Sequence, residues 1–501
     1  MRHIISTILA IVSLSLLTSC EMFEQGFKKH QLIIDSSASC SYEAQEFTIA
    51  YSVDPKFSDQ NIVVTATANA EWITSIDTST PNEIRLTVEE NMGEIRSAKL
   101  EIKASKHKTA YVEIIQYNVP PTKANHTLMF YFLGTSLSRY FKTNLEDAAL
   151  AIETGILGNN NRVVFFRQEG KNSGYIGELC YDLATKKCTE KRIKNITLTG
   201  TLIKPENIGE HIATMAEIAP AERYGIVLAG HGQGWITREI INNDSDISQS
   251  AFGMSYNPWI PAEGAEVTRA FGEDNVRVNI TELAEGIEYS QVQLDYILFD
   301  ACFMANIEAI YDLRYSANYI IASPCEIMGK GFPYHRTLPY LFANNGLSTD
   351  YVGATVSYHQ YYRDEYVGST RCGSVTLFNC AEIDNLARVT KELVKTAKTE
   401  YDTESLQTYE GQDPHHFYDF GQWGKVVGTD STLRKQFIDQ LNNTVVETFS
   451  LDRFYSAYGV YGTYPINLGV YTGVTTSAPS QAYPNGWRAT NWYKEVFELE
   501  N

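Results

Sequence analysis

Two patterns of hydrophobic and polar positions divide the chain into an N-terminal and a C-terminal part. Between residues 31 and 118, short runs alternate apolar and polar positions, with turn residues between them and no helical stretch. Alternation with a period of two is typical of strands that bury one face. Closely spaced strands of this kind predict a small all-β sandwich with an immunoglobulin-like architecture. The predicted strands cover 47–53, 61–66, 84–88, 98–102 and 111–115.

The pattern changes after a predicted linker at 119–125, in which two consecutive prolines favour an extended backbone. In the predicted domain from 126 to 501, wholly apolar runs, typical of strands buried on both faces, alternate with helical stretches. This alternation predicts an α/β domain with a mostly parallel sheet covered on both faces. The predicted strands are 128–133, 162–166, 224–229, 294–299 and 319–322, the predicted helices are 144–154 and 205–218, and a hairpin is predicted at 174–194.

Residues 1–20 are predicted to be a signal peptide. A short basic start precedes an apolar run from Ile4 to Leu17 that is too short to span a membrane. The sequence Leu17-Thr18-Ser19-Cys20 resembles a bacterial lipobox, which implies that Cys20 is lipidated and that 21–30 is a tether. We therefore expect an exported protein that is held by acyl chains alone, at the outer membrane and on either of its faces. The alternative is an ordinary signal peptide in which Cys20 has no such role.

Charge and cysteine content narrow the choice of partners. Asp and Glu number 60 against 41 Lys and Arg, which gives a formal net charge of −19. This charge repels a polyphosphate backbone, so no nucleic acid is expected as a partner. The eight cysteines include no Cys-x-x-Cys pair, which argues against a zinc ribbon or a thioredoxin-like motif. Spacing suggests the pairs Cys180–Cys188 and Cys372–Cys380, and an odd thiol remains once Cys20 is set aside.

Two predicted strands end in residues that are suited to acyl transfer. One runs into His231, which lies between glycines, and another runs into Cys302. Reactive groups gather at the carboxyl ends of parallel strands. A thiol next to an imidazole can act as a nucleophile, with the imidazole as its general base. We expect a helix to start at Cys302 and run to residue 310, which would favour the thiolate. The alternatives are a buried structural cysteine, a structural histidine or, from the Gly-x-Gly-x-Gly pattern, a phosphate loop.

The N-terminal part carries three short motifs, which are Glu71-Trp72-Ile73, the Asn91-x-Gly93-x-x-Arg96 turn and Ile114-Ile115-Gln116. With these motifs, residues 31–118 resemble the BACON domain, a β-sandwich module common in exported Bacteroidetes proteins. The resemblance implies either a spacer that holds the rest of the chain off the membrane or a module that binds glycan or mucin.

The C-terminal part carries a pair of motifs, His231-Gly232-x-Gly234-Trp235 and Asp300-Ala301-Cys302-Phe303-Met304. With both motifs, residues 126–496 resemble the clostripain family of cysteine peptidases. The resemblance implies a caspase-like α/β/α sandwich and an endopeptidase that acts on proteins or peptides through a catalytic dyad without an essential third member. No cofactor is certain, and calcium is the one that the resemblance leaves open. It also implies that Cys302 is the nucleophile and His231 the general acid or base. The backbone N–H groups of Gly232 and Cys302 would form the oxyanion hole.

The resemblance further implies that Asp300 lines the site for an arginine or lysine side chain at P1, the residue before the cleaved bond. The alternative for Asp300 is a strand-end carboxylate that is satisfied by backbone N–H groups. The loop 323–331 departs from the family pattern, because it carries Glu326 but places Lys330 in its Gly-x-Gly turn. A cation there would oppose a basic P1 side chain, so the preference for Arg or Lys is a hypothesis.

Relatives often cleave themselves between the catalytic His and Cys, and Arg238, Arg269 and Arg277 are the candidate positions in this chain. Some relatives use calcium, for which the oxygen-rich run at 242–246 is a candidate although it lacks EF-hand spacing. His415 and His416 with a nearby Asp are a weaker candidate for a metal site, and we expect no metal there.

A rival hypothesis is a surface binding protein, an adhesin or glycan-binding protein whose peptidase-like domain has lost activity. The retention of both His231 and Cys302 argues against it, and Lys330 is its best support. A transferase or transpeptidase that uses the same thioester differs only in what resolves the intermediate.

Overall fold

The computed structural model describes residues 32–53, 62–93, 95–105, 107–117, 123–157, 160–182, 185–198, 204–242, 261–269, 277–398 and 400–498. The predicted signal peptide with Cys20, the tether, most of the linker and nearly all of the oxygen-rich run lie outside these residues. The described chain divides into two compact units, one from the first 120 residues and a larger one from almost all of the rest. Among the described residues, no helix is both long and apolar enough to cross a membrane.

The N-terminal unit is all-β, as the alternating pattern predicts. Its strands form two four-stranded sheets, in the orders β1-β3-β6-β5 and β2-β8-β7-β4. Alternate side chains, such as Ile84 and Leu86, are fully buried in a separate hydrophobic core. The strands are β1 Ile33–Ile34, β2 Ser37–Cys40, β3 Gln45–Ser52, β4 Val64–Ala68, β5 Ile73–Asp77, β6 Glu83–Val88, β7 Arg96–Ala104 and β8 Ala110–Gln116.

The three short motifs of this unit converge on one another. The guanidinium of Arg96 lies 4.7 Å from the ring centroid of Trp72. Its Nε donates a 2.9 Å hydrogen bond to the side-chain oxygen of the buried Gln116, and the Asn91 side chain donates to the Gln116 carbonyl at 3.4 Å. These contacts explain why the three motifs occur together. The BACON resemblance itself stays a prediction.

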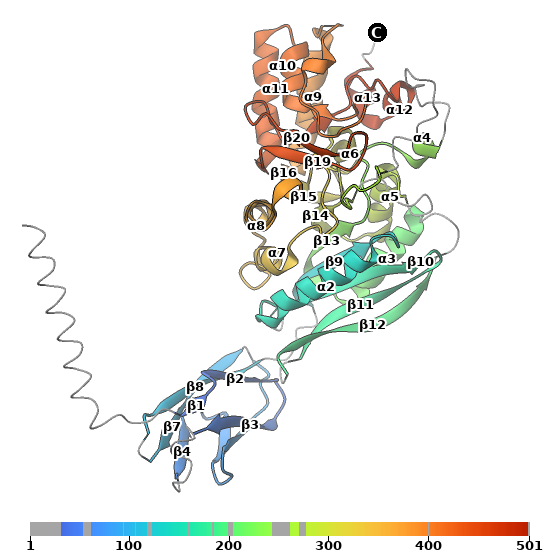
Figure 1. The fold of residues 1–501 in the computed structure, drawn as a ribbon. Coiled ribbons are helices and arrows are strands. Elements are labelled where there is room, and N and C mark those ends of the chain that lie inside the picture. The colour runs from blue at the N-terminus through green and yellow to red at the C-terminus, as the bar shows by residue number, and fades with distance from the viewer. Residues whose placement is uncertain are drawn as a thin grey trace, which may run out of the picture. The chain divides into compact units, whose positions relative to one another are not determined.

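The larger unit is built on a nine-stranded sheet with the order β12-β11-β10-β9-β13-β14-β15-β16-β18 (Figure 1). The five strands from β10 to β15 in this order are parallel, and antiparallel strands extend the sheet at both ends. This arrangement confirms the predicted mostly parallel α/β fold. The strands are β9 Ala124–Phe132, β10 Asn161–Gly170, β11 Ser173–Asp182, β12 Lys187–Thr197, β13 Ala221–Ala229, β14 Leu294–Asp300, β15 Ala317–Ala322, β16 Ser374–Asn379 and β18 Val445–Ser450.

Helices cover both faces of this sheet. Helices α2, α7 and α8 pack together on one side, and α3, α5 and α6 pack on the other (Figure 1). Two small ribbons, β17 Tyr418–Asp419 with β21 Thr475–Thr476 and β19 Arg453–Ser456 with β20 Gly462–Pro465, lie outside the main sheet. The helices are α2 Ser138–Glu153, α3 Pro205–Ile218, α4 Arg238–Asn242, α5 Ile280–Ser290, α6 Ile307–Asp312, α7 Tyr334–Leu341, α8 Tyr351–Asp364, α9 Ile383–Lys395, α10 Phe420–Val427, α11 Ser431–Thr444, α12 Pro484–Arg488 and α13 Asn491–Val496.

The described cysteines are free thiols, so the pairs suggested by spacing are not formed in this structure. Cys180 and Cys188 flank the turn between β11 and β12, but Cys180 lies opposite Thr189 and Cys188 opposite Tyr181. The register of the hairpin therefore offsets the two thiols from each other.

Candidate active site

The topology brings His231 and Cys302 to the same edge of the sheet. Strands β13 and β14 are parallel neighbours, with Ala229 opposite Asp300. His231 and Cys302 each lie two residues beyond this pair, at the carboxyl ends of their strands. His231 is partly exposed, and its Nε2 forms a 2.9 Å hydrogen bond with the hydroxyl of Ser136, which lies in the turn after β9.

Cys302 is fully buried, and its Sγ accepts a 3.0 Å hydrogen bond from the N–H of Ile327. Burial, and after it the negative charge of Glu326, raises the pKa of the Cys302 thiol well above its usual value. The predicted helix start at Cys302 is wrong, because α6 begins only at Ile307. The intervening Phe303 has a φ of 61°, which a right-handed helix does not allow. The Cys302 thiol therefore has no helix terminus beside it to favour its ionisation.

Two backbone N–H groups at this edge converge on one carbonyl oxygen. The N–H of Gly232 donates to the carbonyl of Arg269 at 2.9 Å, and the N–H of Cys302 donates to the same oxygen at 3.1 Å. Position 232 has no room for a side chain, because a Cβ there would lie 2.1 Å from the carbonyl oxygen of Cys302. Glycine therefore lets the two donors approach each other and share an acceptor.

The side chain of Arg269 is fully buried beside Asp300. Its Nη1 lies 2.8 Å from the Asp300 carboxylate, its Nη2 donates to the Asn144 side chain at 2.7 Å, and its Nε donates to the carbonyl of Gly329 at 3.1 Å. Burial raises the pKa of Asp300, and the guanidinium of Arg269 opposes that shift. The arrangement binds a planar cation from several directions, which suits a guanidinium.

Asp300 is itself held by neighbours on the loop and helix that follow β15. The hydroxyl of Tyr334 donates to its carboxylate at 2.5 Å, and the N–H of Phe332 donates at 3.3 Å. Gly331 has a φ of 71°, and a Cβ there would lie 2.4 Å from both the Arg269 guanidinium and the Asp300 carboxylate. The glycine therefore leaves the space that the ion pair occupies.

Residues 267–269 lie as a short extended segment along 327–329. The N–H of Arg269 donates to the carbonyl of Ile327 at 2.9 Å, and the N–H of Gly329 donates to the carbonyl of Val267 at 2.7 Å. Thr268 and Met328 form the antiparallel bridge between these bonds. This pairing fixes the direction of the 267–269 segment and the position of the Arg269 side chain beside Asp300.

Lys330 does not bring its charge to Arg269. The Lys330 side chain is exposed, and its ammonium lies 5.7 Å from the ring centroid of Tyr366. Its carbonyl accepts a 2.8 Å hydrogen bond from the Asn144 side chain. Lys330 therefore supports the arginine site through its backbone, and its cation faces an aromatic ring instead.

The remaining sequence candidates lie elsewhere. His415 Nδ1 contacts the buried carboxylate of Glu410 at 3.2 Å, and His416 Nε2 contacts the Gln412 side chain at 2.8 Å. The described part of the chain holds no group of three or more His, Cys, Asp or Glu that could bind a metal ion. Calcium at 242–246 stays a sequence-based expectation. Arg238 is engaged in an ion pair with Glu282 of α5.

Sequence reasoning missed several residues of the site. Asn144 lies on the buried face of α2 and contributes its amide to Arg269, although it carries no motif. Ser136 and Tyr334 also come from segments distant in sequence from His231 and Cys302. The Gly-x-Gly turn marks Gly331 in the sequence, but it does not predict that this glycine lies against the Arg269–Asp300 pair.

Comparisons with known proteins agree with this geometry. The sequence profile of the clostripain family matches residues 255–459. The X-ray structure of iotapain, a secreted C11 cysteine protease from Bacteroides thetaiotaomicron, is 30% identical with a TM-score of 0.64, over 75% of this chain and 100% of that one. An inactive zymogen of a C11 protease from Parabacteroides distasonis is 26% identical with a TM-score of 0.60, over 75% of this chain and 99% of that one. No curated protein matches.

Proposed function

The chain belongs to the clostripain family of cysteine peptidases, and on this premise we propose that it is an endopeptidase that cleaves after arginine or lysine, with Cys302 as the nucleophile and His231 as the general acid and base. The observation that carries the proposal is the placement of Arg269. Its carbonyl accepts hydrogen bonds from Gly232 and Cys302, and its side chain pairs with Asp300. A P1 residue of a substrate needs these same contacts.

In the proposed reaction, His231 takes the proton of the Cys302 thiol, and the resulting thiolate attacks the P1 carbonyl carbon. The negative charge that develops on the carbonyl oxygen is stabilised by the N–H groups of Gly232 and Cys302, and each such donor is typically worth about 10²–10³ in kcat. His231 donates a proton to the leaving amine and then takes one from the water that hydrolyses the thioester. The products are a carboxylic acid and an amine, and the thiol is regenerated.

The Arg269 contacts support a preference for arginine at P1. A guanidinium satisfies Asp300, Asn144 and Gly329 together, whereas the single ammonium of lysine presents no planar fork. The contact of the Lys330 ammonium with the ring of Tyr366 also supports a basic P1 residue, because this cation then faces an aromatic ring.

The same contacts support self-cleavage at the Arg269–Ala270 bond. Of the three candidate arginines, Arg269 has its carbonyl on the two N–H donors, whereas Arg238 is engaged with Glu282. Wild-type protein should yield a fragment that begins at Ala270, and Cys302→Ala should stay intact. Arg269→Gln should block this cut, and Arg238→Gln is the matched control that should not. Identical intact bands for wild type and Cys302→Ala would reject self-cleavage.

Turnover of fluorogenic amidomethylcoumarin peptides tests the function itself. Peptides with Arg, Lys, Asn, Asp or Ala at P1 are compared with wild type and Cys302→Ala. Arg and Lys peptides should be cleaved fastest, and Cys302→Ala should lose at least about a thousandfold in kcat. If Arg and Lys peptides are the worst substrates, the P1 assignment fails. If neither protein turns over any peptide after trials with calcium and with trypsin activation, the binding-protein alternative is favoured.

Export and lipid anchoring complete the proposal. The lipobox-like Leu17-Thr18-Ser19-Cys20 and the secreted relative from Bacteroides thetaiotaomicron support an exported protein that is anchored through Cys20 at the outer membrane. The β-sandwich would then serve as a spacer or bind glycan or mucin. Labelling with a palmitate analogue should mark the wild type and not Cys20→Ala, and equal labelling of both would reject the anchor.

A further inference from the structure

Thr268, the residue before Arg269, contacts a second carboxylate at the candidate active site. Side chains alternate along an extended segment, so the Thr268 side chain points away from Asp300. Its hydroxyl donates a 2.6 Å hydrogen bond to Oε2 of Glu326. Glu326 is only 3% exposed and Thr268 6% exposed, so this contact is enclosed. Thr268 therefore occupies the position that P2, the residue before P1, would take in a substrate.

The Glu326 carboxylate is fixed from the side opposite to Thr268. Its Oε1 accepts a 2.7 Å hydrogen bond from the hydroxyl of Ser456, and the N–H of Ala457 lies 3.1 Å from both carboxylate oxygens. These donors belong to the end of strand β19, which is fixed in the fold. Neither donor belongs to the segment that carries Thr268. The Glu326 carboxylate therefore keeps its orientation when Thr268 moves away from it.

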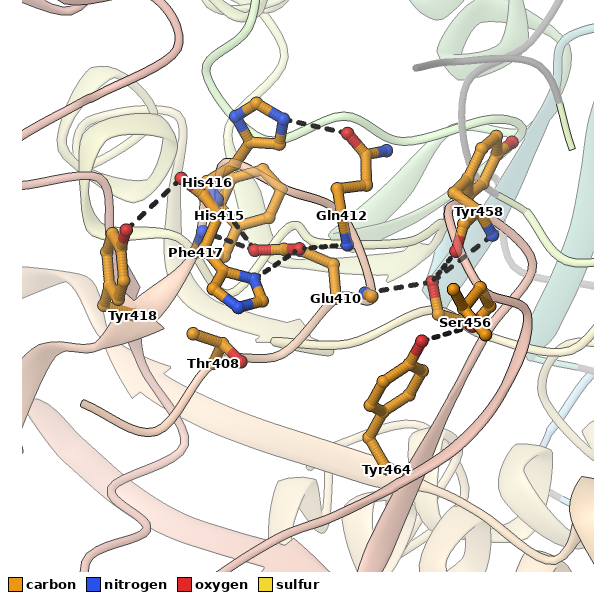
Figure 2. Close-up of polar contacts among 12 residues, drawn as sticks. Thr408, Glu410, Gln412, His415, His416, Phe417, Tyr418, Ser456, Tyr458 and Tyr464 are labelled. Atoms are coloured by element: carbon orange, nitrogen blue, oxygen red, sulfur yellow. Dashed lines mark hydrogen bonds and ion pairs between the residues drawn. The ribbon is translucent and has the colours of Figure 1, made fainter. Parts of the chain in front are cut away.

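The position of Ser456 is in turn set by the loop shown in Figure 2. Its hydroxyl accepts a 3.2 Å hydrogen bond from the N–H of Gly411. The neighbouring Glu410 carboxylate accepts from the backbone N–H groups of Gln412 at 2.9 Å and His416 at 2.7 Å, and thereby organises the loop. The carboxylate of Glu326 is thus supported by a network that extends well away from the peptide segment.

On the basis of the proposed peptidase function, we infer that Glu326 is the specificity-determining residue of the S2 subsite and selects substrates with threonine or serine at P2. A hydroxyl at P2 gives the inward-facing carboxylate oxygen its donor. Valine has the shape of threonine but leaves that buried oxygen without a hydrogen-bond donor. A site built around a hydrogen bond rejects an analogue that cannot form the bond. An aspartate at P2 would place a second negative charge against Glu326.

A peptide series on the full-length wild-type protein tests this inference without any variant. The peptides end in arginine at P1 and differ only at P2, which is Thr, Ser, Val, Lys or Asp. Thr and Ser should exceed Val by at least about tenfold in kcat/KM, and Asp should be the slowest. Equal rates for Thr and Val, or Lys as the fastest, would overturn it. If no arginine peptide is cleaved at all, the peptidase proposal itself fails and the inference fails with it.

The variant Glu326→Gln then assigns the selectivity to this residue. It should reduce the Thr-to-Val ratio at least about fivefold and relieve the penalty for Asp, while the preference for Arg over Ala at P1 stays as in wild type. Glu288→Gln, an exposed position on α5, is the control and should change neither ratio. An active Glu326→Gln protein with an unchanged Thr-to-Val ratio would contradict the inference. If Glu326→Gln does not fold, the wild-type series decides.

Discussion

At the residue scale, the central feature is the ion pair between Arg269 and Asp300, in which both side chains are fully buried. Removing two charges from water is costly, and the cost is offset only where further hydrogen bonds complete both partners. Here the Asn144 amide completes the guanidinium, and the Tyr334 hydroxyl completes the carboxylate. Loss of one partner would leave the other charge buried without its counterion.

We expect Asp300→Asn, made in the inactive Cys302→Ala protein, to lower the free energy of unfolding of the larger unit by about 3–5 kcal/mol. The reason is that Arg269 would stay buried without a carboxylate. Urea unfolding followed by tryptophan fluorescence measures the difference. Glu288→Gln in the same background should stay within about 0.5 kcal/mol. An Asp300→Asn protein as stable as its parent would mean that the pair contributes little in the uncleaved chain.

Glu326 gives a second residue-scale prediction, which concerns pH. Burial raises the pKa of Glu326 to about 7 from its ordinary 4.5. The pKa of Glu326 is higher in the folded than in the unfolded protein, so protonation of Glu326 stabilises the fold. This contribution to the free energy of unfolding is fully present below about pH 4.5 and is lost as the pH rises through about 7. As the pH rises from 5 to 8, the free energy of unfolding of Glu326→Gln should therefore increase relative to that of wild type by up to about 3 kcal/mol. Parallel stability curves for the two proteins, measured in the Cys302→Ala background, would contradict this assignment.

At the element scale, the pairing of 267–269 with 327–329 presents the Arg269 carbonyl to its donors. If the Thr268 hydroxyl positions this segment through Glu326, its removal should slow self-cleavage without removing the cut site. We expect Thr268→Val to slow the appearance of the Ala270 fragment at least about tenfold and Thr268→Ser to retain most of the rate. Gel densitometry over time measures both. Equal rates for Val and Ser would place the control of self-cleavage elsewhere.

The sequence was informative for elements whose burial pattern is regular. Helix α3 begins and ends at the predicted residues, and β13 and β14 run into His231 and Cys302 as expected. Helix α2 begins at Ser138, before the predicted start at residue 144. The pattern predicts a helix from Cys302 where the structure has a turn, because the left-handed backbone of Phe303 leaves no mark in the hydrophobic pattern.

The parts of the site that sequence could not predict depend on long-range contacts. Asn144 and Glu326 reach the segment at 268–269 from elements that precede and follow it in the chain. Asn144 belongs to no short motif, and the 323–331 loop marks Glu326 without predicting its contact with Thr268. Both side chains reach the 268–269 segment only after the sheet has formed. Likewise, three arginines fitted the interval between His231 and Cys302 equally well, and only tertiary structure separates Arg269 from the other two.

At the scale of the whole molecule, each of the two compact units has its own hydrophobic core. Among the described residues, those that form hydrogen bonds with the Arg269 side chain belong to the larger unit. We therefore expect residues 123–501, produced alone, to cleave arginine peptides with a kcat/KM within about twofold of the full chain, since domains with separate cores fold independently. A soluble but inactive fragment would show that the N-terminal unit contributes to the active site.

The placement of Arg269 also has a consequence for reaction order. The segment that ends at Arg269 is tethered to the same polypeptide as Cys302, so its encounter with the nucleophile needs no second molecule. On the proposal that the Arg269–Ala270 bond is cut through this contact, the cut is unimolecular, and its half-time should be the same at nanomolar as at micromolar protein. A dilution series separates the two cases, because cleavage between molecules slows in proportion to concentration. The proposed cut would therefore proceed even at very low protein abundance, because it needs no encounter with a second molecule.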